Sequence, residues 1–160
     1  LKNGRYVHME RIKPSPGKVI SGTHGYFWWN NDICYEVTSF EAKIKANGET
    51  IQFSGDMWEN RKLMSVSGTW SAKVKKIYSR GQKYAEKLSK GIDERLTLIG
   101  KLADPDNGGA ERVQIMNAWL DELTLQAFEN GKITEDEFSG GFVGFEYLDS
   151  IADPCSNTNA

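Results

Sequence analysis

The chain has 160 residues, with 20 basic and 22 acidic side chains and a net charge of -2. This length suits one domain with a sizeable core, and the near-neutral charge excludes an overall electrostatic attraction to nucleic acid or membranes. Residues 1–18 are the exception, because they form a basic arm with the single acidic residue Glu10. The basic residues of this arm are Lys2, Arg5, Arg11, Lys13 and Lys18.

The apolar runs and the cysteines indicate the cellular compartment in which the protein folds. No run approaches the length of a signal-peptide core or a membrane span, which predicts a protein that folds in the cytosol without a membrane anchor. Cys34 and Cys155 lie far apart in the sequence. We expect two reduced thiols, with a disulfide as the alternative.

Residues 19–150 carry the pattern of a folded domain, and residues 151–160 form a polar tail. The first predicted strand, residues 19–29, is dense in aromatic side chains and ends at an Asn-Asn-Asp turn. Residues 33–46 follow as a second strand, which alternates apolar and polar side chains in its second half.

The most regular stretch is residues 65–77. Its apolar side chains, Trp70 among them, fall on one parity and its polar side chains on the other, which predicts a long strand with one packed and one solvated face. We expect it to pair with residues 33–46 and share a polar face. Asn47-Gly48 is predicted to be a turn, followed by a short strand at residues 49–53.

Residues 54–63 show no periodicity, yet they contain Met57 and Trp58. Two interpretations stay open: these side chains fold back on the body, or they anchor a partner.

The second half of the chain adds one helix and further strands. The helix is predicted over residues 80–90, capped by Ser79 and ended by Gly91. Turns are predicted at residues 104–109 and at Asn130-Gly131. The remaining strands are predicted at residues 93–102, 111–120, 123–128 and 138–148. The total of about seven strands and one helix predicts antiparallel β structure with a helix packed on it.

No constellation for catalysis or metal binding appears. The two histidines, His8 and His24, have no Cys or carboxylate at metal-ligand spacing, and the chain lacks a nucleophile elbow. The DPDNGG sequence of residues 104–109 resembles a calcium loop, but Ile115 stands where the bidentate Glu is required. The acidic run of residues 135–137 is interpreted as a solvated edge. We therefore expect neither an enzyme nor a cofactor.

Two further features have structural interpretations. Gly140-Gly141 favours a bulge or a close approach of another subunit. A group of lysines could contact nucleic acid, although the polar face of the strand and the outer face of the helix account for them equally well. These are Lys73, Lys75, Lys76, Lys83, Lys87 and Lys90.

The order of these elements resembles the tail tube proteins of contractile-tailed bacteriophages of Gram-positive bacteria and related defective prophages. The likeness covers roughly residues 20–149, outside the basic arm and the polar tail. The segments that carry it are ISGTHGYFWWNNDICYEVTSFEAKIKAN, SGTWSAKVKKIYSR, GAERVQIMNAWLDELTLQAF and GGFVGFEYLD.

The resemblance implies a structural subunit: an antiparallel β-sandwich or half-barrel with one helix, which completes a large β-barrel in a hexameric ring. Stacked rings would form a hollow tube in the virion tail, assembled in the bacterial cytoplasm. The implied partners are further copies of the chain, the tail sheath protein, the tape measure, baseplate and tail terminator proteins, and phage DNA in the lumen.

The resemblance also implies roles for particular residues. The loop that contacts the adjacent ring would present Met57, Trp58, Glu59 and Arg61. Interior and exterior residues alternate on barrel strands, so one parity of the long strands would face the lumen or a subunit junction. The members of this parity are Glu41, Lys43, Lys45, Thr69, Ser71, Lys73 and Lys75. The expected core residues are Phe40, Ile44, Val66, Trp70, Val74 and Trp119.

The sequence leaves alternative functions open. A tube subunit of this type could belong to a phage-tail-like bacteriocin or another contractile injection system instead of a phage. A second class is a monomeric β-barrel binding module that uses the polar face as its ligand surface. The excess of lysines on that face leaves the sign of the lumen charge open.

Overall fold

A computed structural model describes residues 13–153 of the chain. It contains two short 3-10 turns, η1 and η2, nine strands and one helix within these residues. Their bounds are η1 Pro16–Lys18, η2 Gly22–His24, β1 Gly25–Trp29, β2 Asp32–Ile33, β3 Val37–Ile51, β4 Asn60–Lys75, α1 Gln82–Ser89, β5 Leu96–Leu102, β6 Glu111–Ala118, β7 Glu122–Leu123, β8 Glu135–Phe142 and β9 Phe145–Asp149.

The strands form two antiparallel sheets that pack as a sandwich. The five-stranded sheet has the order β2-β1-β5-β6-β9, and the four-stranded sheet has the order β3-β4-β8-β7. The predicted class, mainly β with one helix, is confirmed. The core between the sheets is rich in aromatic rings: the Trp29 ring lies 5.8 Å from Trp70 and 5.1 Å from Phe138, centroid to centroid.

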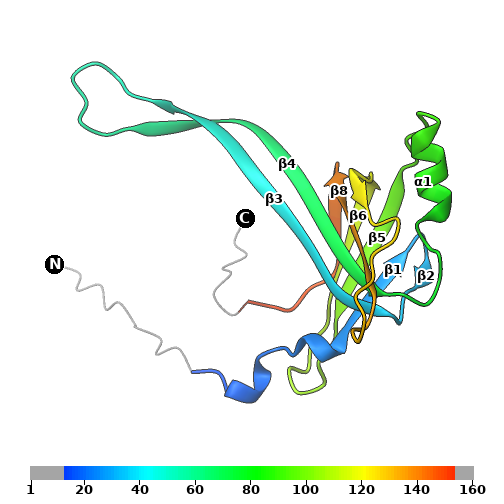
Figure 1. Cartoon of the computed structure of the whole chain (residues 1–160). Coiled ribbons are helices and arrows are strands. Elements are labelled where there is room, and N and C mark those ends of the chain that lie inside the picture. The colour runs from blue at the N-terminus through cyan, green and yellow to red at the C-terminus, as the bar shows by residue number, and fades with distance from the viewer. Residues whose placement is uncertain (1–12, 154–160) are drawn as a thin grey trace.

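The paired long strands β3 and β4 reach well beyond the sandwich (Figure 1). They are antiparallel over their whole length, with Ala42 opposite Trp70 and Ile51 opposite Asn60. The predicted turn at Asn47-Gly48 is therefore wrong, because both residues lie inside β3. The pairing is irregular there, and a side chain at Gly48 would collide with the Arg61 side chain, so this glycine allows close approach of the strands.

Several predicted boundaries shift. The first strand begins at Gly25, since a 3-10 turn precedes it, and the helix N-cap is Gly81 instead of Ser79, with no side-chain cap. Gly91 ends the helix at φ 77°, as predicted. The predicted strand at residues 123–128 is reduced to Glu122–Leu123.

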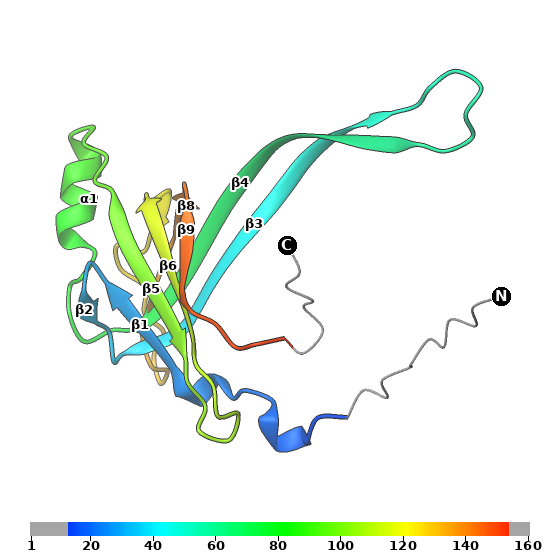
Figure 2. The same cartoon turned by 180° about the vertical axis from the view of Figure 1, so that it is seen from behind.

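The predicted strand at residues 138–148 is two strands. β8 ends at Phe142 in the four-stranded sheet, and β9 starts at Phe145 in the five-stranded sheet, so the chain crosses between the layers at Gly144, where φ is 96°. Figure 2 shows β9 beside β6 at the edge of the five-stranded sheet.

The acidic run of residues 135–137 is only partly a solvated edge. Glu137 points to solvent, but Asp136 is buried among the core residues because strand side chains alternate between faces. The Lys76 amine pairs with the Asp136 carboxylate at 2.8 Å, which compensates the buried charge.

Gly140 and Gly141 do permit a close approach, but the group that approaches belongs to the same chain. A Cβ on Gly140 would lie 1.8 Å from the carbonyl oxygen of Trp119, and a Cβ on Gly141 would lie 2.3 Å from the Trp119 ring. Trp119 lies just beyond the end of β6, where its backbone carbonyl faces Gly140 and its ring covers Gly141.

The basic arm, the cysteines and the expected lack of a membrane span remain to be compared with the structure. The basic arm and the polar tail lie largely outside the described residues, as does Cys155. Cys34 is buried and unpaired, and its burial raises the pKa of the thiol, which therefore stays protonated at neutral pH. Within residues 13–153 no helix is long and apolar enough to span a bilayer.

Candidate functional site

The solvated face of the four-stranded sheet is the first candidate site. Strand pairing places Glu41, Ser71, Ser139 and Glu122 in one row across all four strands. All seven side chains predicted to share this parity on β3 and β4 are exposed and lie on it. The structure thus brings together Glu41, Lys43, Lys45, Thr69, Ser71, Lys73 and Lys75.

The charge of this polar face is balanced. The sequence pattern of β3 and β4 predicts four lysines against one glutamate, but β7 and β8 add carboxylates on the same side of the sheet. The four lysines are Lys43, Lys45, Lys73 and Lys75, and the four acids are Glu41, Glu122, Glu135 and Glu137.

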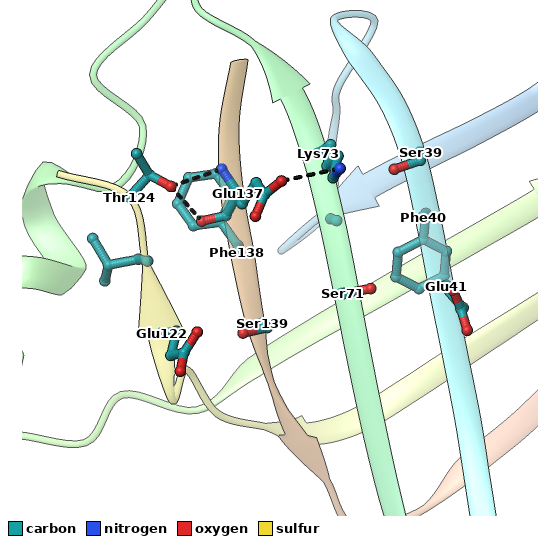
Figure 3. Close-up of a pocket in the computed structure, with 12 residues that line it drawn as sticks. Ser39, Phe40, Glu41, Ser71, Lys73, Glu122, Thr124, Glu137, Phe138 and Ser139 are labelled. Carbon is teal, nitrogen blue, oxygen red and sulfur yellow. Dashed lines mark hydrogen bonds and ion pairs between the residues drawn. The ribbon is translucent and has the colours of Figure 1, made fainter. Parts of the chain in front are cut away.

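Two of these lysines have short contacts with acids in the same subunit. Lys73 lies 3.0 Å from Glu137 on the neighbouring strand, and Lys43 lies 2.5 Å from Glu41 (Figure 3 shows the first pair). Each hydrogen-bonded carboxylate raises the pKa of its lysine, so both amines stay charged. Both pairs are exposed, and their main effect is to neutralise the surface locally.

Sequence reasoning missed Glu122, Glu135 and Glu137 as members of the polar face. A signal was present for the last two, because Glu135, Glu137 and Ser139 alternate with Asp136 and Phe138. No such signal existed for Glu122, whose strand is two residues long.

The hollows on the polar face are shallow and open. One is lined by Ser71, Lys73, Glu122, Glu137 and neighbours, and Figure 3 shows its side chains spread along the sheet surface, not converging on a point. No group of three or more potential metal ligands occurs among residues 13–153. The face has the form of a wall.

The tip of the β3–β4 hairpin is the second candidate site. Met57 and Trp58 are 92% and 82% exposed, and the loop that carries them lies far from the sandwich (Figure 1). The first of the two interpretations, that these side chains fold back on the body, is therefore wrong. Glu59 and Arg61 are also exposed at this end of the hairpin.

Local hydrogen bonds shape this tip. The Trp58 backbone N–H donates to the Asp56 carboxylate at 3.0 Å, and the Gln52 side-chain amide donates to the Asp56 carbonyl at 3.0 Å. Gly55 has φ 81°, a conformation that favours glycine. Hydrogen bonds between side chains and backbone thus hold the loop, while its apolar side chains stay exposed to solvent.

Some of the expected core residues are buried or pack against the core, and others are exposed. Trp70 and Val74 are buried, Phe40 packs against the core and Trp119 is half-buried. The expectation is wrong for Ile44 and Val66, which are 57% and 59% exposed.

The cause is the length of the hairpin. Gly68 is the last β4 residue opposite β8, where the Phe142 ring covers it, and beyond it no second layer exists among the described residues. The face of the hairpin that carries Ile44 and Val66 is apolar and uncovered.

Among residues 13–153 the arrangement is therefore a polar sheet face with two unpaired edges and a projecting hairpin, one face of which is apolar. A family model described as "Phage tail tube protein" matches residues 13–149. The chain belongs to the phage tail tube protein family.

One curated relative of this tail tube protein is the phage-like element PBSX protein XkdM of Bacillus subtilis strain 168. The two are 24% identical over 138 residues, which covers 84% of this chain and 94% of that protein. The resemblance inferred from the sequence is confirmed.

Solved structures share the fold at low sequence identity. A chain in the extended PVC sheath–tube complex, an extracellular contractile injection system, matches 86% of this chain and 100% of its own, with a TM-score of 0.63 at 10% identity. A chain in the six-fold symmetrised baseplate of the anti-feeding prophage matches 78% of this chain and 90% of its own, with a TM-score of 0.55 at 7% identity.

Membership of this family settles the class of function. The relatives are structural tail tube proteins, so this chain is a structural component of a phage or phage-tail-like particle and not an enzyme.

Proposed function

We propose that this tail tube protein assembles into stacked hexameric rings that form the hollow inner tube of a contractile tail. The polar face of the four-stranded sheet lines the lumen, and the hairpin tip contacts the adjacent ring. The observation that carries the proposal is the balanced polar face, with four lysines and four glutamates on the solvated side of a sheet whose two edges are unpaired within residues 13–153.

Physical chemistry supports this orientation. A closed barrel removes free strand edges, and a barrel of many strands encloses an aqueous channel lined by one parity of its side chains. A near-neutral wall neither traps the polyanionic DNA backbone nor repels it strongly. The six-fold symmetry named for the similar baseplate supports six copies per ring.

The apolar arm supports stacking of the rings. Its tip carries Met57 and Trp58, which gain nothing from exposure in a monomer and would be buried against the next ring. Further partners are the sheath, which forms a complex with the tube in the similar PVC structure, and terminator, tape measure and baseplate proteins. The role of the subunit is the same in a phage, where DNA passes, and in a phage-tail-like bacteriocin or injection system.

Negative-stain microscopy of the purified protein tests the proposal. We expect rings or hollow rods that lengthen as the protein concentration rises. A protein that stays monomeric at high concentration, also with its sheath protein present, would contradict the proposal and favour the alternative of a monomeric binding module.

Replacing the two tip side chains tests the stacking contact. We expect Met57→Ala combined with Trp58→Ala to raise the concentration required for rods by about tenfold or more, since buried aromatic anchors dominate interfaces. Rings should still form, and urea unfolding of the monomer should be unchanged because both side chains are exposed.

Tyr35→Ala is the matched control, since it removes an exposed aromatic side chain from the body instead of the tip. Rod formation by the double variant at the wild-type concentration would show that the tip is not the contact.

A further inference from the structure

The four-stranded sheet has two different free edges. β3 forms one edge over the 15 residues Val37–Ile51, and β7 forms the other over only Glu122–Leu123. No strand within residues 13–153 pairs with either outer side. A long unpaired edge is a template for another strand.

Because the sheet has an even number of strands, its two edges can join between neighbouring copies. The four strands are antiparallel throughout, so β7 of one copy runs antiparallel to β3 of the next when all copies have the same orientation in a ring. The resulting contact is head-to-tail and repeats around the ring.

The segment that follows β7 has a strand sequence, but beyond Thr124, whose backbone N–H donates to the Glu137 carbonyl at 3.0 Å, it has no strand partner among residues 13–153. Residues 123–128 read LTLQAF, with apolar Leu123, Leu125 and Ala127 alternating with Thr124 and Gln126. In the structure only its first residue belongs to a strand, and Leu125 is 78% exposed. Extended segments of this kind form strands by adding to an open sheet edge.

We propose that residues 122–127 add as a strand to the β3 edge of a neighbouring copy, with Glu122 opposite Lys45. This inference rests on the proposed ring and goes beyond it, because it names the two segments, their register and the ion pair that sets the register.

The charges of the polar face exclude the unstaggered register. Glu122 and Glu41 end the same row of the sheet, so joining the rows directly would place two carboxylates opposite each other. A closed barrel requires a stagger, and only an even shift keeps each side chain on its own face. Shifts of two and four residues toward the hairpin tip bring Lys43 and Lys45, respectively, opposite Glu122.

The ion pairs inside the subunit favour Lys45. The Lys43 amine already lies 2.5 Å from the Glu41 carboxylate, whereas Lys45 and Glu122 make no ion pair with any residue from 13 to 153. Pairing Glu122 with Lys45 joins the one unpaired acid at the β7 edge to the unpaired base at the β3 edge.

This register also places apolar side chains together. In an antiparallel pair the two residue numbers have a constant sum, so Leu123 falls opposite Ile44 and Leu125 opposite Ala42. All four side chains lie on the side of the sheet away from the lumen. The neighbouring copy thereby provides partners for Ile44 and Leu125, which are exposed in the single chain.

A charge swap tests the pairing. We expect Glu122→Lys and Lys45→Glu each to raise the concentration at half-maximal ring assembly by about tenfold, because each places like charges at the junction. The double variant should return to within about threefold of the wild type, since the ion pair is restored with reversed polarity. Mass photometry and negative-stain microscopy measure ring assembly, and thermal unfolding confirms that the variants fold.

Glu86→Lys is the control, because it makes the same charge change on the exposed face of α1, away from both edges. A double variant no better than its worse single variant would overturn the pairing. Rescue of Glu122→Lys by Lys43→Glu but not by Lys45→Glu would overturn this register in favour of the shorter shift. If the wild type forms rings and the swap fails, only this inference falls; if the wild type forms no rings, the proposed function falls.

A cross-link provides a second measurement. Glu122→Cys combined with Lys45→Cys places two thiols on directly opposite residues of neighbouring copies, close enough for a disulfide. We expect oxidation of assembled rings to yield a ladder of covalent multimers on a denaturing gel. A ladder absent with Lys45→Cys but present with Lys43→Cys would contradict the register.

Discussion

Replacing Trp70 by Asp is expected to unfold the subunit. The Trp70 ring is buried against Trp29, and its indole N–H donates to the Trp119 carbonyl at 3.1 Å. The change removes a large aromatic side chain and places an unpaired carboxylate in the core, which costs about 4 kcal/mol or more of the free energy of unfolding. Urea unfolding followed by circular dichroism, at concentrations where the chain is monomeric, measures the loss.

Trp58→Asp is the matched control for this change. It makes the same substitution in a side chain that is exposed at the hairpin tip, so we expect the monomer to unfold at the wild-type urea concentration. A folded Trp70→Asp variant with an unchanged urea midpoint would contradict the placement of Trp70 between the two sheets.

Gly140→Ala is expected to have the second large effect. The added Cβ would lie 1.8 Å from the Trp119 carbonyl oxygen, and the blocking atom is backbone, so the chain between β6 and β7 must move away from β8. Because that movement also displaces the Trp119 backbone that accepts the Trp70 hydrogen bond, we expect a loss of about 3 kcal/mol in the free energy of unfolding.

Gly22→Ala serves as its control, because a Cβ on Gly22 meets no atom within 4 Å. The control should leave the thermal midpoint within about 2 °C of the wild type, since such surface changes are small. Equal midpoints for the two alanine variants would show that the contact between Trp119 and the β8 glycines is not tight.

Both candidate sites could be predicted in part from the sequence. Strand alternation depends on a local period of two, so the exposed parity of β3 and β4 and the pairing of these strands were predictable from residues alone. The sequence also indicates Met57 and Trp58 as contact residues, because a polar loop offers these exposed apolar side chains no local partner.

Strand alternation could not predict which side chains on the apolar side are buried. Ile44 and Trp70 lie on the same apolar side of the sheet, yet Trp70 is covered by the second sheet and Ile44 is not. Alternation states on which side a residue lies, whereas coverage depends on where another layer ends. That limit is set by the pairing of Gly68 with Phe142, two residues far apart in the chain.

The net charge of the polar face also depends on which distant strands pair. The lysines of β3 and β4 could be read from their own strands, but the acids that balance them come from β7 and β8. Only strand pairing places Glu137 within 3.0 Å of Lys73. The sign of the wall charge therefore required the order of the strands.

By itself the sequence determined the class of the protein, its long alternating strands, the single helix with its glycine stop, and the resemblance to tail tube proteins. These properties depend on local periodicity and turn chemistry, which neighbouring residues encode. Only the tertiary structure decided that β3 and β4 leave the sandwich as an uncovered arm, that the polar wall is balanced in charge, and that residues 125–128 have no strand partner among residues 13–153. Each of these depends on which distant strands pair and where that pairing stops, and a single strand does not contain that information.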